Sequence, residues 1–239
     1  MLVVPTGSGN DFAKSLGITN AEVALQAWKR FCANGGNVRE IDLGLIRPGN
    51  KTGDQTGGGP QPEEIFFCGV AAIGMDADAN AGANRLPAWL KGRGGYLLAA
   101  LRSLIAFAPA EIRVTETGLT SAGRETAGRE IRRSAFFVAV GNTHTYGGGM
   151  KIAPGASMND GWLDICYISA MNKLKLLCWM PTIFFGRHLR LAGVEYFQAQ
   201  TVQIDADRPL EVYADGDYAC RTPVEIGVVT KGLSVIVPN

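Results

Sequence analysis

Apolar and polar residues alternate along much of this chain with the two-residue period that is typical of strands. The alternation is clear at 38–46, an apolar run at 65–72 suits a more deeply buried strand, and strands are also predicted at 131–141, 162–169 and 194–205. Further short strands are predicted at 2–4, 111–115, 210–213 and 233–237. So many short strands, interrupted by few helices, predict an antiparallel β-sandwich or barrel, a mainly β fold with some α.

Three segments carry helical spacing. Residues 11–34 are predicted as helical after a first loop, and the glycines at 35–36 end that pattern. Residues 89–108 and 173–191 are strongly apolar, and Pro181 is expected to interrupt the second of them. Core packing is the simpler interpretation of both, while the Lys and Arg residues at their borders leave contact with lipid as an alternative.

Composition narrows the class of protein. Of the 239 residues, 46% are hydrophobic and 19% charged, which indicates a globular core. The net charge is +1, so no global field points to a nucleic-acid partner, and no nucleic-acid motif is present. The five cysteines are scattered without a CxxC pair, as in a reduced cytoplasmic protein, and no apolar stretch is long enough to span a bilayer.

The most chemical segment is P-T-G-S-G-N-D-F-A at residues 5–13. A short strand at 2–4 would lead into a glycine-rich turn and then a helix, and such a turn exposes backbone N–H groups that suit phosphate. The candidate phosphate-binding residues are Gly7, Ser8, Gly9, Asn10 and Asp11. In the structural alternative, Asn10 or Asp11 caps the helix. Nothing precedes this strand to pair with it, so we expect either a shortened chain or the second half of a larger enzyme.

Several ordered blocks carry a resemblance to a known family. The first block, with Ser8 in place of a usual threonine, resembles the P-x-G-T-x-N-D-F-A segment of the diacylglycerol kinase catalytic family, which includes bacterial lipid kinases and sphingosine kinases. Later blocks are similar to the same family over almost the whole chain: G-V-A-A-I-G-M-D-A at 69–77, V-A-V-G-N at 138–142, G-G-G-M-K-I-A-P at 147–154, N-D-G-W-L-D at 159–164 and D-G-D at 215–217.

The resemblance implies an architecture of two parts. An α/β domain with a GGDGT nucleotide loop would precede an antiparallel β-sandwich. No GGDGT occurs in this sequence. Residues 1–36 are therefore predicted as the end of an incomplete nucleotide-binding domain, and residues 37–239 as the substrate-side sandwich. The absent N-terminal half becomes an expected partner, and the unpaired edge at 2–4 favours a homodimer.

The D-G-D segment is the candidate catalytic centre. Asp217 occupies the position of the family's general base, which is normally glutamate, and Asp215 stands beside it. Their spacing directs both carboxylates to one side of an extended segment, whereas on sequence alone a hairpin turn is the better interpretation. Aspartate is one methylene shorter than glutamate, so the carboxylate falls roughly 1 Å short, a misplacement that can cost about 10²-fold in rate.

A metal site is implied at residues 157–162. There the family pattern assigns Mg²⁺ to the Asp160 carboxylate with main-chain oxygens of Ser157 and Trp162, a ligand set that Mg²⁺ accepts. The structural alternative is a plain Asn-Asp-Gly turn. Asp42 would connect the ion to the active site through a network of ordered water, or cap a strand end. Asp11 is a second candidate for Mg²⁺ or for ordered water.

These residues and the resemblance together predict the C-terminal part of a lipid kinase that uses ATP and Mg²⁺. Its substrate would be diacylglycerol or a similar lipid alcohol, reached by transient contact of a cytoplasmic protein with a membrane surface. Two alternatives remain open: an enzyme of the NAD kinase type, and a non-catalytic lipid-binding protein derived from this fold.

Overall fold

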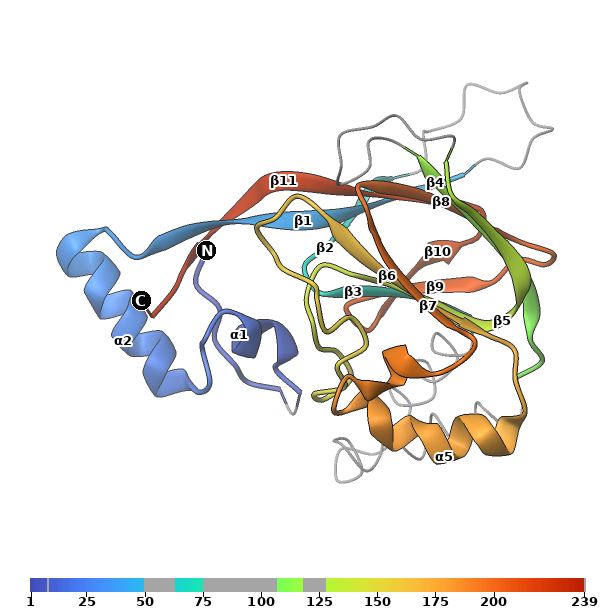
Figure 1. The fold of residues 1–239 in the computed structure, drawn as a ribbon. Helices are drawn as coiled ribbons and strands as arrows, with labels where there is room; N and C mark the ends of the chain where they lie inside the picture. The colour runs from blue at the N-terminus through green and yellow to red at the C-terminus, as the bar shows by residue number, and fades with distance from the viewer. Residues whose placement is uncertain (8, 50–62, 75–106, 118–127, 239) are drawn as a thin grey trace, which may run out of the picture.

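The computed structural model describes residues 1–7, 9–49, 63–74, 107–117 and 128–238. In this part of the chain, antiparallel strands form one continuous hydrogen-bonded sheet that folds over into two layers (Figure 1). In chain order the strands are β1 Val38–Pro48, β2 Ile65–Phe67, β3 Val70–Gly74, β4 Ala110–Thr117, β5 Glu130–Gly141, β6 Leu163–Ser169, β7 Val194–Ala199, β8 Thr201–Ala206, β9 Glu211–Ala214, β10 Asp217–Arg221 and β11 Val224–Ile236. The predicted antiparallel β-sandwich is confirmed.

Strand β5 belongs to both layers. Its first half, 130–135, pairs with β4, while its second half pairs with β3 at one edge and with β6 at the other. One layer therefore has the order β10-β9-β3-β5-β6-β7, and the other has β5-β4-β8-β11-β1-β2. A strand shared in this way turns a single sheet into a nearly closed sandwich.

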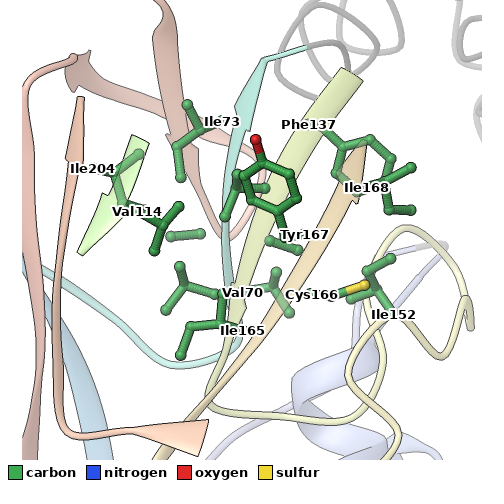
Figure 2. Close-up of a cluster of buried hydrophobic side chains, with 14 of the residues drawn as sticks. Val70, Ile73, Val114, Phe137, Ile152, Ile165, Cys166, Tyr167, Ile168 and Ile204 are labelled. Atoms are coloured by element: carbon green, nitrogen blue, oxygen red, sulfur yellow. The ribbon is translucent and has the colours of Figure 1, made fainter. Parts of the chain in front are cut away.

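The main core fills the space between the layers. Side chains from β3, β4, β5, β6 and β8 meet there, and Figure 2 shows Tyr167 among Val70, Ile73, Val114 and Ile204. Burial follows the sequence pattern: β4 alternates because one face is covered, whereas β6 is buried on both faces. The second face of β6 lies under the helical segment described next.

Two helical segments cover one side of the sandwich. Helix α5 (Lys173–Ile183) begins where the side chain of Asn172 accepts the N–H of Leu174 at 2.8 Å, and the 3₁₀ helix η2 (Arg187–Arg190) follows. Pro181 lies inside α5, so the predicted interruption at this proline is wrong. The break falls instead at Gly186, whose φ of 66° favours glycine.

A smaller unit forms around α1 (Asp11–Ser15) and α2 (Ala21–Asn34). Figure 1 shows it beside an extension of β1 and β11 that reaches out of the sandwich as a two-stranded ribbon. A separate apolar cluster joins the helices to this ribbon, and the cluster consists of Ala13, Leu16, Ile18, Ala24, Ile41, Val235 and Val237. Both chain ends lie here, because the N–H of Ile236 donates to the carbonyl of Met1.

Several sequence-based element bounds need correction. The run 65–72 is divided at Cys68-Gly69 into β2 and β3, and the run 194–205 is divided at Gln200 into β7 and β8. Strand β10 and most of β11 were not expected. The strand predicted at 2–4 is absent from the described structure, and residues 89–106 of the predicted first apolar helix lie outside it. The two-domain division at 36/37 stays a prediction.

Candidate functional site

The glycine-rich loop at 7–10 is closed by one asparagine. The N–H of Gly7 donates to Asn10 Oδ1 at 2.9 Å, and Asn10 Nδ2 donates back to the Gly7 carbonyl at 2.6 Å. Asn10 therefore adopts a left-handed φ of 54° and makes no capping hydrogen bond to α1, so the predicted cap is wrong. Ser8 lies outside the described residues. The loop remains a candidate phosphate-binding segment, shaped by its own side chain rather than by a helix cap.

Asp11 connects this loop to the glycine run at 147–149. Its Oδ2 accepts the N–H of Gly148 at 2.7 Å, so Asp11 is not a cap of α1 either. The run forms a tight turn closed by two hydrogen bonds between Tyr146 and Met150, and all three glycines have positive φ. The second oxygen, Asp11 Oδ1, is buried and has no hydrogen-bond partner in the described part of the chain. A buried carboxylate oxygen in this condition is suited to an ordered water, a metal ion or a ligand.

The D-G-D segment is a two-residue hairpin turn. Asp215 and Gly216 both have positive φ, 51° and 96°, and they connect β9 to β10. The expected extended segment with both carboxylates on one side is therefore wrong, and the hairpin alternative is confirmed. Asp217 is the first residue of β10.

The two aspartates of this hairpin have different surroundings. Although residue 215 is exposed as a whole, the Asp215 carboxylate turns back and accepts the N–H groups of Cys68, Gly69 and Val70 at 2.7–3.1 Å. Burial of this carboxylate and the nearby Asp217 raise its pKa, against the three N–H donors, which lower it. Asp217 is exposed, and within the described residues its side chain makes no hydrogen bond or ion pair. Of these two aspartates, Asp217 is the one whose carboxylate has no partner among the described residues.

A clamp on Gly69 explains the division of β2 from β3. A Cβ atom added at Gly69 would lie 2.7 Å from Asp215 Oδ1, so only glycine leaves room for the carboxylate. The Gly69 carbonyl accepts the N–H groups of Asn142 and Thr143 on its other side. These contacts on both sides of Gly69 fix the backbone at residues 68–69, which belong to neither β2 nor β3.

Asn142 links the hairpin to Asp42. Its buried Nδ2 donates to the Cys68 carbonyl at 2.8 Å and to the Asp42 carbonyl at 2.9 Å. Because the Asp215 carboxylate accepts the N–H of Cys68, a chain of hydrogen bonds runs from Asp215 through Cys68 and Asn142 to Asp42. Asn142 directly follows the last residue of β5, and its sequence motif alone assigns it no role.

Asp42 is a buried hub in the middle of β1. Its two carboxylate oxygens accept the N–H groups of Lys231 and Gly161, both at 2.8 Å, and its own N–H donates to the Met158 carbonyl. The register of β1 against β11 shifts at this position, so that Asp42 fills a bulge. The strand-end cap expected for Asp42 is therefore wrong. Its contacts within the described residues are direct hydrogen bonds, and a connection to the ion through ordered water stays a prediction.

The predicted metal loop lies against Asp42. Asp160 Oδ1 accepts the N–H of Trp162 at 3.0 Å, which makes the expected turn. Ser157 Oγ donates to the Asn159 side chain at 2.7 Å. Burial raises the pKa of Asp160, and the Asp42 charge raises it further against the Trp162 hydrogen bond.

This loop fits a Mg²⁺ site of one carboxylate with main-chain oxygens. A bound cation would contact the Asp160 carboxylate and offset its repulsion with Asp42. In the described parts of the chain, no three His, Cys, Asp or Glu side chains converge as a metal cluster would require. The fit therefore rests on a single carboxylate, Asp160, as the sequence implied.

A polar pocket lies between α1, the ribbon and this loop. It has a volume of about 150 Å³ and is lined by Ser15, Arg39, Ile41, Thr143, His144, Ala156, Ser157, Met158 and Asn159. Arg39 makes no ion pair with any described residue. A concave, polar pocket with a cationic side chain at its wall is suited to an anion.

Sequence reasoning missed Asp164. This residue is 1% exposed, and its carboxylate accepts the Tyr196 hydroxyl at 2.6 Å and Gln198 Nε2 at 3.2 Å. Tyr196 in turn accepts the N–H of Gly155, which joins β6 and β7 to the segment before the metal loop. A charged residue at the start of an otherwise apolar strand was the available signal.

Known proteins share both this sequence and this architecture. Residues 69–237 match the family described as the YegS C-terminal NAD kinase beta sandwich-like domain. A diacylglycerol kinase of Mycobacterium tuberculosis (strain H37Rv) is 34% identical over 243 residues, which cover 99% of this chain and 69% of that protein. This chain belongs to the diacylglycerol kinase family. The names of its relatives are those of lipid kinases, and NAD kinase enters only through the description of the sandwich.

Relatives of lower sequence identity also match almost the whole of this chain. The diacylglycerol kinase of Bacillus subtilis (strain 168) is 24% identical over 99% of this chain and 69% of its own length. The crystal structure of a diacylglycerol kinase from Bacillus anthracis (strain Sterne) has a TM-score of 0.62 at 18% identity, which supports the fold. It is covered over 65% of its length and covers 98% of this chain. The chain thus spans about two thirds of the length of these relatives.

Within the described residues, no helix combines the length and the apolar character that crossing a bilayer requires.

Proposed function

We propose that this chain works in an ATP- and Mg²⁺-dependent lipid kinase that phosphorylates diacylglycerol or a similar lipid alcohol. The supporting observation is the hydrogen-bonded chain Asp215–Cys68–Asn142–Asp42, which continues to the Asp160 loop through Gly161. This chain connects the hairpin that carries Asp217 to the loop that carries Asp160. Phosphoryl transfer needs a base and a counter-charge held in fixed relation, and the connection supports such a relation between the two segments.

In this proposal Asp217 acts as the base. Its carboxylate accepts the proton of the lipid hydroxyl, and Asp215 positions the hairpin without contacting the reacting atoms. Bound ATP would supply the phosphoryl group, and Mg²⁺ held by Asp160 with main-chain oxygens of Ser157 and Trp162 would offset negative charge nearby. The loop at 7–11 and the cationic wall of the polar pocket at Arg39 would hold phosphate groups.

The test is turnover in the protein that contains this chain, with diacylglycerol in mixed micelles. Asp217→Asn removes the base and is expected to lower kcat by about 10²–10⁴-fold. Asp217→Glu restores the longer side chain and is expected to raise kcat by up to about 10²-fold. The matched control is Asp207→Asn, another exposed aspartate whose side chain has no partner among the described residues, and it should leave kcat unchanged.

Three results would overturn the proposal. An Asp217→Asn variant that keeps most of the activity would exclude Asp217 as the base. Phosphorylation of NAD in place of diacylglycerol would assign the chain to the NAD kinase type. Binding of diacylglycerol without any turnover in the wild-type protein would favour the non-catalytic alternative.

A further inference from the structure

Helix α5 is apolar on two opposite sides. Leu176, Met180 and Ile183 face the sandwich and are buried in its core. On a helix with 3.6 residues per turn, the opposite side carries Leu174, Leu177, Cys178 and Pro181, and the same direction continues to Phe185 just beyond the helix. These five residues are called the outer stripe below. A helix that is apolar on both sides is ordinarily covered on both.

The outer stripe is open in the structure. Leu174 and Phe185 are each 72% exposed, and Leu177 is 37% exposed. Single exposed apolar residues are normal on a protein surface, but a contiguous stripe on one helix face marks an interaction site. Figure 1 shows α5 along the lower side of the sandwich, while α2, the β1–β11 ribbon and the chain ends lie to the left of it.

The charged residues in the sequence segment that contains the stripe are all basic. Between Asp164 and Glu195 the sequence contains no acidic residue, while Lys173, Lys175, Arg187 and Arg190 are basic. Lys173 and Lys175 lie about 100° to either side of Leu174 around the helix axis. The Lys175 ammonium lies 4.3 Å from the centre of the Trp179 ring, so this lysine and an aromatic side chain share one border of the stripe.

An apolar stripe with basic borders complements an anionic lipid surface. The apolar side chains would enter the boundary of the acyl region, and the basic side chains would meet acidic headgroups. A protein partner would have to bring an acidic rim to match the same borders. The uniform positive charge over thirty residues therefore favours a bilayer over a second copy of this chain, whose own stripe carries the same charge.

We propose that the outer stripe of α5 is the surface by which this protein docks on an anionic bilayer. The inference deepens the proposed function, since a lipid alcohol is reached in a bilayer. It is nonetheless tested by binding alone. Because the substituted side chains are exposed, the variants described next are expected to remain folded.

The experiment measures binding of the full chain to sedimented vesicles. Vesicles of phosphatidylcholine alone are compared with vesicles that also contain phosphatidylglycerol, at low and high salt. The double variant Leu174→Ser with Phe185→Ser is expected to weaken binding at least about tenfold. Each substitution removes the favourable free energy of transferring an apolar side chain from water into the bilayer. The double variant Lys173→Gln with Lys175→Gln is expected to lose about fivefold per charge on anionic vesicles, and this loss should shrink at high salt.

Matched controls separate the stripe from general surface properties. Leu25→Ser with Phe66→Ser removes two apolar side chains that are 50% and 54% exposed elsewhere, and Lys29→Gln removes a charge on α2. These controls should bind as the wild type does, with unchanged melting temperatures throughout. A second copy as the occupant would appear as a dimer that the stripe variant dissociates.

Equal vesicle binding by the stripe variant and the wild type would overturn the proposal, as would dissociation of such a dimer without any change in vesicle binding. Turnover on a short-chain, water-soluble diacylglycerol is measured in parallel in the longer protein that contains this chain, with the same substitutions. A stripe variant that loses vesicle binding but keeps this turnover supports the docking surface. A wild-type protein that binds vesicles but shows no turnover contradicts the proposed function alone.

Discussion

Asp215 and Asp217 stand on either side of one glycine, and the hairpin uses them differently. Asp215 adopts a left-handed φ, and its carboxylate is occupied by three backbone N–H groups. Asp217 begins a strand and stays exposed. A sequence motif thus joins a structural residue to a candidate catalytic one, and substitutions can separate their roles.

Measurements of the free energy of unfolding should separate the roles of Asp215 and Asp217. Asp215→Asn keeps the shape but replaces a charged acceptor of three N–H groups with a single neutral oxygen. We expect the free energy of unfolding to fall by about 1–3 kcal/mol. Asp217→Asn is expected to change it by less than about 0.5 kcal/mol. Chemical denaturation of both variants beside the wild type checks this, and equal stabilities of the two variants would contradict the assignment.

His188 is expected to give the fold a dependence on pH. Its ring is 1% exposed, Nε2 lies 3.2 Å from the Ile152 carbonyl, and burial lowers its pKa against that hydrogen bond. Because the unfolded chain then binds the proton more readily, stability is full above the unfolded pKa of about 6.5 and falls as the pH drops below it.

The measurement is the free energy of unfolding between pH 5 and pH 7.5 for two variants. His188→Gln retains a donor for Ile152 and should remove the loss of stability at acid pH. His144→Gln removes the other histidine, which is half-buried at the polar pocket, and should keep that loss. The same slope in both variants would show that a different group titrates.

At the scale of elements, local patterning predicted most strands but not their ends. Alternation was sufficient for β4, of which one face is buried, whereas β5 is continuously buried over residues 135–141 and was recognised by its apolar run. The division at Cys68-Gly69 was invisible, since the run is continuously apolar and the break comes from Asp215, which is distant in sequence. Long-range hydrogen bonds of this kind leave no local periodicity.

The candidate site was predictable to a similar extent. The resemblance to the family's motifs singled out Asp160, Asp215 and Asp217. It could not indicate that Asn142 bonds both Cys68 and Asp42, because a buried amide has no characteristic sequence neighbours.

The metal loop carries a prediction of its own. Mg²⁺ at about a hundredfold excess over its dissociation constant should stabilise the wild type by about 2.7 kcal/mol, if it binds only the folded state. Asp160→Ala removes the one carboxylate ligand, so the magnesium-dependent rise in melting temperature should disappear. Thermal melts with MgCl₂ and with NaCl of equal ionic strength check this, beside Asp207→Ala as a control. An undiminished rise in Asp160→Ala would place the ion elsewhere.

At the scale of the whole molecule, the β1–β11 ribbon joins a small helical unit to a large sandwich. The polar pocket lies where the two meet, lined by Ser15 of α1, Arg39 of the ribbon and residues 156–159 of the metal loop. A ligand in that pocket would contact both parts of the molecule.

The 239 residues on their own are expected to show no appreciable kinase activity. The family resemblance assigns nucleotide phosphates mainly to a GGDGT loop, and only the segment 7–11 is present here on the phosphate side. Losing aligned phosphate contacts removes both positioning and charge stabilisation, which carry most of catalysis in phosphoryl transfer. ATP turnover with diacylglycerol micelles, measured for this chain and for a version extended at its N-terminus, checks the expectation. Comparable rates would show that the site is complete in these residues.

The pairing of β1 with β11 also dictates when the sandwich can close during synthesis. Val38 pairs with Ile236, and β11 lies between β8 and β1 in the sheet. On the ribosome, β11 emerges after every other described strand, so β8 and β1 each wait with an open edge that another nascent chain can join. Translation that stopped before Val224 would leave both edges open permanently and would deprive Asp42 of the Lys231 N–H. Shortened products of this gene should therefore be aggregation-prone and short-lived.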